Sequence, residues 1–127
     1  MPSQAKHKET ADRFLRLYEA IPEEFPEGRA IALFYCALHL IEMVAATENR
    51  HCRNHFLRGR YIRSEHRHIW KFYRPLQEAS EHARYLAGGG FTMTAEQVES
   101  VLRRKYLAAI EQWAMSRAGE SDSSPSH

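Results

Sequence analysis

The chain has 127 residues, of which 43% are hydrophobic and 27% charged, and its formal net charge is +2. These values are typical of one globular domain and exclude wholesale disorder, which requires few apolar residues and a large net charge. The longest stretch without Asp, Glu, Lys or Arg is Ala30–Ile41. This stretch is shorter than the roughly 18 residues of a membrane span, so no membrane partner is expected.

The first fourteen residues contain no apolar segment of the kind found in signal peptides. The two cysteines, Cys36 and Cys52, are too few for a small disulfide-stabilised scaffold. We therefore expect a cytoplasmic protein with two free thiols. Because cations near Cys52 favour a thiolate, we expect Cys52 to be the more reactive of the two.

Helical periodicity predicts the first two helices over residues 3–20 and 26–46. Ser3 is a candidate N-cap, and Pro22 ends the first helix. The connector between the helices contains Phe25, which we expect to fill part of the core. The second helix is apolar nearly all round, as is typical of a buried central helix.

A weaker pattern predicts a short helix from Asn54, and the next helix is expected to start at the cap Ser64 and to run to Leu86. Pro75 lies inside that helix, where a kink or a restart is expected. Thr94 and Gln97 have the spacing of a capping box at the start of the last helix, which Gly119 should end.

These elements predict one all-α domain over residues 1–118, an antiparallel bundle of four to five helices, followed by a disordered tail over residues 119–127. Seven side chains are expected in its core: Phe34, Leu38, Ile41, Phe72, Leu76, Leu102 and Ile110.

The near-neutral total hides a basic segment between Arg50 and Arg74, which holds eight basic residues and one acid, Glu65. Such a segment indicates an anionic partner, RNA or a nucleotide. Aromatic residues such as Trp70 are interleaved with the cations and could stack on bases. The candidate nucleic-acid-binding residues are Arg53, Arg58, Arg60, Arg63, Arg67 and Lys71. Alternatively, these cations pair with Glu19, Glu23, Glu24 or Glu27 of the same or of a second subunit.

Arg50 and His55 are the candidate catalytic residues, since an arginine can hold a phosphate and a histidine can move a proton near neutral pH. Together they could cleave RNA by activating its own 2′-hydroxyl. The alternative is a solvated basic loop. His51, Cys52 and His55 lack the paired spacing of zinc ligands, so no metal and no cofactor are expected.

His39 and Glu42 are three residues apart in the most apolar helix, and so share one face. Buried polar groups need partners. They either bond to each other or to a tyrosine such as Tyr85, or they line a pocket.

Several segments in order resemble the HEPN (higher eukaryotes and prokaryotes nucleotide-binding) domain family. The aromatic-rich Phe34–Glu42 segment comes first, the histidine-containing loop His51–His55 follows, and Ile69–Leu76 and Glu78–Leu86 complete the pattern. The resemblance covers roughly residues 10–115 and is greatest to small bacterial members.

The resemblance implies a small helical bundle, a homodimer and two kinds of function. Many HEPN proteins are metal-independent ribonucleases with an Arg and a His separated by four to six residues, in toxin–antitoxin pairs with a nucleotidyltransferase or in phage defence. Others bind nucleotides or protein partners. Here the late Arg84 has no such histidine, whereas Arg50 and His55 have the spacing. We therefore expect a module that binds nucleic acid or nucleotide; a ribonuclease toxin and a structural or regulatory protein are the alternatives.

Overall fold

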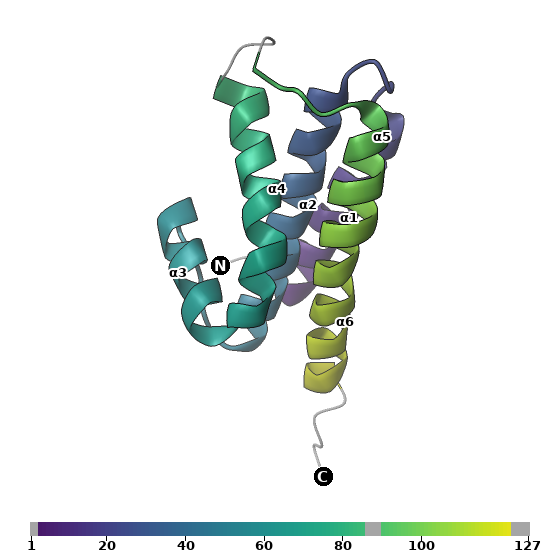
Figure 1. Ribbon diagram of the computed structural model, residues 1–127. Helices are drawn as coiled ribbons and strands as arrows, with labels where there is room; N and C mark the ends of the chain where they lie inside the picture. Colours follow the sequence, from purple (N-terminus) through teal and green to yellow (C-terminus); the bar gives the residue numbers. More distant parts are fainter. Residues whose placement is uncertain (1–2, 86–89, 123–127) are drawn as a thin grey trace.

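The computed structural model describes residues 3–85 and 90–122, in which every regular element is helical. The elements are α1 (Gln4–Ala20), α2 (Pro26–Thr47), α3 (His55–Glu65), α4 (Arg67–Tyr85), α5 (Ala95–Gln97), η1 (Val98–Leu107) and α6 (Ala108–Asp122). The last three are continuous and form one long helical segment (Figure 1). The predicted all-α bundle of four to five helices is confirmed.

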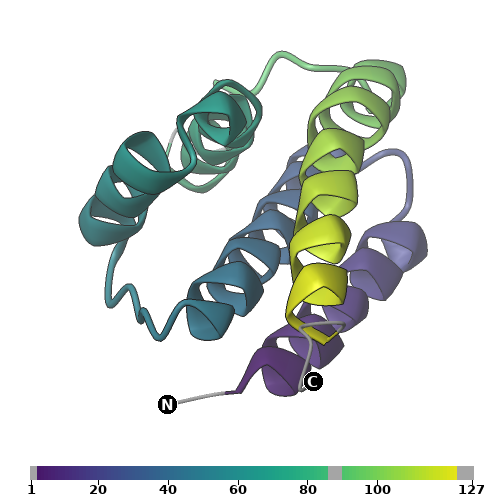
Figure 2. The same cartoon turned by 90° about the horizontal axis from the view of Figure 1, so that it is seen from below.

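Helix α2 is the central element, as its all-round apolar sequence predicts. It packs against α1, α4, η1 and α6. Figure 2 shows α3 and α4 together on one side of α2, while α1 lies on the other side. Because α3 packs mainly on α4, it presents most of its outer surface to solvent.

Local side-chain bonds fix three of the helix starts where the sequence predicts them. Ser3 Oγ accepts from the backbone of Lys6 at 3.2 Å, and Asn54 Oδ1 accepts from that of Leu57 at 2.8 Å. Thr94 and Gln97 form both bonds of the capping box. These caps satisfy amide donors that the first turn of a helix leaves without partners.

The junction between α3 and α4 differs from the prediction. Ser64 lies inside α3, so it is not the cap of α4. The chain turns at His66, whose buried Nε2 lies 3.1 Å from both carboxylate oxygens of Glu48. The Tyr61 hydroxyl also donates to Glu48, at 2.5 Å. These bonds tie the junction to the end of α2, a long-range constraint that local sequence does not reveal.

Helix α4 runs through Pro75 without a restart. Its predicted last residue, Leu86, lies outside the described residues. The last helical segment contains a ten-residue π-helix, η1, which the sequence analysis did not anticipate. This segment continues past Gly119 to Asp122, so the predicted stop at Gly119 is wrong. Residues 123–127 of the predicted tail lie outside the described part of the chain.

The predicted core is buried with one exception. Phe72 is only partly buried and packs at the edge of the core, against Tyr106. The prediction for Phe25 is also wrong, since this side chain is 49% exposed. The other six predicted core residues are buried: Phe34, Leu38, Ile41, Leu76, Leu102 and Ile110.

Helix α2 is long and apolar enough to cross a membrane, judged by length and composition alone. The longest stretch without charged residues, Ala30–Ile41, is too short to indicate that the whole helix meets these criteria. Most of its apolar part, 72%, is buried against the rest of the protein. A buried core helix meets the same criteria, so this observation is weak evidence for a membrane span.

Candidate functional site

A buried ion pair lies between α2 and α3. Nε of Arg58 is 3.1 Å from Oε1 of Glu42, and both side chains are less than a tenth exposed. A second nitrogen of the same guanidinium, Nη2, donates to the backbone oxygen of Cys52 at 3.2 Å. Arg58 therefore joins the central helix, the loop after it and α3. This corrects the prediction for Arg58, which is an interior residue and does not lie among the exposed cations.

Arg58 also fixes the chemistry of His55. Its Nη1 lies 3.2 Å from His55 Nδ1. A guanidinium can only donate, so Nδ1 must be the acceptor, and the neutral ring carries its proton on Nε2. Burial, with the charges of Arg58 and Arg84, lowers the pKa of His55. His55 is thus a neutral histidine whose outer nitrogen is a hydrogen-bond donor.

A pair of histidines connects α1 to α2. Nδ1 of His7 lies 3.1 Å from Nδ1 of His39, and Phe14 stacks on the His39 ring with the centroids 5.8 Å apart. One ring must donate and the other accept, so the bond requires that at least one ring be neutral. Burial, together with the charges of His7 and Arg58, lowers the pKa of His39 to about 4.

These contacts decide between the alternatives for the polar residues of α2. His39 and Glu42 do not bond to each other; His39 pairs with His7, and Glu42 pairs with Arg58. Tyr85 is 71% exposed and is the partner of neither. We name Glu42, Arg58, His7, His39 and His55 the polar cluster.

The structure does not bring Arg50 and His55 together. Nη1 of Arg50 lies 3.7 Å from Glu65, and its guanidinium covers the ring of Tyr61. His55 instead contacts Arg58 and the ring of Phe34. A histidine that acts as a general base needs a free nitrogen facing the substrate, and Nδ1 of His55 is engaged by Arg58. This geometry does not favour the ribonuclease alternative.

The remaining candidate binding residues are exposed on α3, on the loop before it and on the start of α4. With Arg50, they form what we call the basic surface: Arg50, Arg53, Arg60, Arg63, Arg67 and Lys71. Within residues 3–85 and 90–122, only Arg50 among them forms an ion pair with a carboxylate. None of them pairs with Glu19, Glu23, Glu24 or Glu27 of the same chain in these ranges; pairing with these residues of a second subunit stays a prediction.

Aromatic side chains support part of the basic surface. The guanidinium of Arg63 lies over the ring of Trp70, 4.8 Å from its centroid. Arg67 and Lys71 are one turn apart on the same exposed face of α4. Trp70 is partly buried between α3 and α4, with the edge of its ring near Gly59.

A polar hollow of about 370 Å³ lies beside α3, next to the loop that follows α2. Two guanidiniums and an imidazole border it, from Arg50, Arg60 and His51. The other lining residues are Cys52, Leu57, Tyr61 and Ser64. Phosphate is the ligand that such a set of donors suits best, because guanidiniums form charge-assisted bonds to its oxygens.

The prediction of two free thiols is confirmed. Cys36 and Cys52 are both free, but both are also buried. Burial raises the pKa of Cys52, and the neighbouring Glu42 raises it further. The expectation that nearby cations favour a Cys52 thiolate is therefore wrong, while the ranking of Cys52 as the more reactive of the two thiols stays a prediction. Among the described residues, no group of three or more His, Cys, Asp or Glu side chains is arranged to hold a metal ion.

Two residues of this region were not identified from the sequence. His7 lies in a polar first turn that resembles any solvated helix start, and only the packing of α1 on α2 buries it. Arg84 bonds to the Tyr35 hydroxyl at 2.9 Å and its charge acts on His55. The resemblance includes Arg84, but its position near His55 depends on how α3 folds against α4.

Comparison of this chain with protein-family models, with curated proteins and with solved structures finds no match.

Proposed function

We propose that this protein binds phosphorylated ligands, RNA or a nucleotide, through its basic surface. The observation that carries the proposal is the polar hollow, where Arg50, His51 and Arg60 border one concavity. Basic side chains that only keep a helix face solvated would not need to converge on one concavity. Since like charges repel one another, this arrangement favours an anion that neutralises them.

The neighbouring contacts extend the proposal to a ligand that carries bases. Trp70 lies under Arg63 and between the exposed cations of α3 and α4. Aromatic rings beside a charged groove bind single strands by stacking, with little dependence on sequence. RNA that crosses the basic surface would place phosphates on the arginines and a base near Trp70.

The salt dependence of RNA binding tests the proposal. Each phosphate contact on a single strand contributes about −0.7 to the slope of log K against log salt. Three to five contacts predict a slope of roughly −2 to −3.5. Arg60→Ala should make the slope shallower by about 0.7 and weaken all RNA sequences alike, because phosphate contacts carry no sequence information.

Arg16→Ala is the matched control, since Arg16 is an exposed arginine on α1, outside the basic surface. It should leave both affinity and slope unchanged. Absence of RNA and nucleotide binding at an ionic strength of about 50 mM, where surface charges are weakly screened, would overturn the proposal. Equal losses of RNA affinity in Arg60→Ala and Arg16→Ala would also count against the proposal, because they would indicate a nonspecific effect of net charge.

The proposal does not include RNA cleavage. In the presence of a chelator the RNA should stay intact, and cleavage that His55→Ala abolishes would instead favour the ribonuclease. The HEPN resemblance, the homodimer, the nucleotidyltransferase-type antitoxin and the cytoplasmic location stay predictions.

A further inference from the structure

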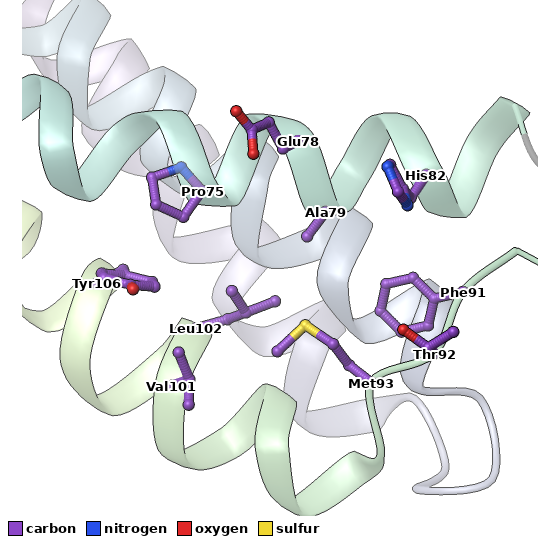
Figure 3. A pocket seen from close by; sticks show the side chains of 10 residues that line it. All are labelled: Pro75, Glu78, Ala79, His82, Phe91, Thr92, Met93, Val101, Leu102 and Tyr106. Carbon is purple, nitrogen blue, oxygen red and sulfur yellow. The ribbon is translucent and has the colours of Figure 1, made fainter.

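An apolar hollow of about 250 Å³ lies between α4, residues 91–93 and η1. Figure 3 shows Leu102 and Met93 pointing into the space that Ala79 faces from α4. Pro75 and Tyr106 close one end, and Phe91 lies at the other. The α4 wall of the hollow begins at Pro75, one turn after Lys71 of the basic surface, but none of its lining residues belongs to that surface, and the proposed function makes no use of it.

The hollow lies where short side chains of α4 face η1. On α4 the wall consists of Pro75 and Ala79, one turn apart, whose short side chains do not reach η1. The opposite wall is the ten-residue π-helix η1. Long π-helical runs are rare, and π-turns are frequent at functional sites.

Apolar side chains around the hollow stay partly exposed to solvent. Phe91, Met93 and Tyr106 are packed against the core but are not buried by it. Each Å² of apolar surface removed from water stabilises by about 25 cal/mol. A ligand that fills the hollow would therefore gain binding free energy from surfaces that the fold alone leaves uncovered.

The polar groups at the rim limit the chemistry of that ligand. Glu78, His82 and Thr92 lie there, and each can accept a hydrogen bond. The Glu78 carboxylate is already neutralised by Arg74, at 2.6 Å. His82 and Thr92 can also donate, whereas the Glu78 carboxylate can only accept, so the rim can bind one N–H or O–H group and holds no carboxylate without an ion-pair partner.

We propose that this hollow binds an uncharged aromatic molecule of one or two fused rings that carries one N–H or O–H group. An apolar cavity of about 150 Å³ accommodates benzene, so a hollow of about 250 Å³ suits one or two rings. Met93 would contact the ring through its sulfur, a favourable arrangement, and a rim acceptor would hold the polar group.

The test uses indole as the probe and the full chain, observed by methionine-methyl NMR. Met93 should shift saturably, with a Kd on the order of 0.1–1 mM for a ligand of this size. Met115 is exposed on α6 and is the internal control, so its signal should not move. Indene has the same shape without the N–H, and it should bind several-fold more weakly.

Ala79→Phe fills the hollow and should weaken indole binding at least tenfold. Phe56→Ala removes an exposed aromatic side chain on α3 and should leave indole binding unchanged. Equal shifts at Met93 and Met115, or a lack of saturation, would overturn the proposal with the unmodified protein alone. Full indole affinity in a folded Ala79→Phe variant would overturn it as well.

Discussion

Nε of Arg58 lies 3.1 Å from Oε1 of Glu42, and this buried pair joins the central helix to α3. Arg58 also donates to Cys52 and to His55. One side chain therefore holds the loop that carries Arg50 and His51 against the bundle. The position of the polar hollow depends on an interior residue that does not itself line it.

Removal of Arg58 should strongly destabilise the protein. Arg58→Ala leaves the Glu42 carboxylate buried without its partner, which typically costs about 3–5 kcal/mol. Arg60→Ala, two residues away on the exposed face, should change the free energy of unfolding by less than about 0.5 kcal/mol. Urea unfolding of both variants measures the difference.

Replacement of both members of the pair separates their attraction from the cost of an unpaired charge. Glu42→Leu with Arg58→Met should be less destabilising than Arg58→Ala alone, since no buried charge is left. A double variant that is less stable than Arg58→Ala would show that the pair contributes mainly through its geometry.

His55 should titrate below its ordinary pKa and should be an Nε2–H tautomer when neutral. Burial, followed by the charges of Arg58 and Arg84, lowers the pKa, and the bond that Arg58 donates to Nδ1 sets the tautomer. Long-range ¹H–¹⁵N NMR spectra distinguish the two ring nitrogens. The exposed His82 is the reference ring. An Nδ1–H tautomer at His55 would contradict the assigned contact.

The protein should lose stability as the pH falls from about 6.5, the pKa of an unfolded histidine, toward 4. The folded pKa of His39 is lowered to about 4, first by burial and then by the charges of His7 and Arg58; that of His7 is also lowered. The unfolded chain then binds more protons in this range, so the free energy of unfolding falls with decreasing pH. Each histidine contributes a slope of at most about 1.4 kcal/mol per pH unit.

Urea unfolding at pH 7.5, 6 and 5 measures this slope. His7→Leu combined with His39→Phe should reduce it, because Phe can still stack on Phe14 and neither of these two rings is left to protonate, while the lowered pKa of His55 still contributes. His82→Ala on the surface of α4 is the control and should keep the slope of the unmodified protein. A slope that the double variant does not change would assign the acid sensitivity to other groups.

Both thiols should react slowly in the native protein. Burial raises the pKa of Cys36 to about 12 and also raises that of Cys52. Titration with a thiol reagent near pH 7.5 should detect two sulfhydryls only after denaturation. Fast reaction of one thiol under native conditions, lost in Cys52→Ser, would show that the loop opens readily.

Features that depend on residues close together in the chain could be predicted from the sequence alone. The caps at Ser3, Asn54 and Thr94 are as predicted, because each bond joins residues three apart. The burial of α2 is also as predicted, since a helix that is apolar all round has no face suited to water. The concentration of cations before and within α3 follows directly from the order of the residues in the chain.

Which residues of the same type become buried and which stay exposed depends on the tertiary structure. Arg58 and Arg60 are the same residue type two positions apart, yet one is buried and the other is exposed. The difference arises because the face of α3 that meets Glu42, sixteen positions earlier, contains Arg58. Likewise, His66 sets the turn before α4 through Glu48. Such roles depend on contacts between distant segments, which periodicity and capping rules do not encode.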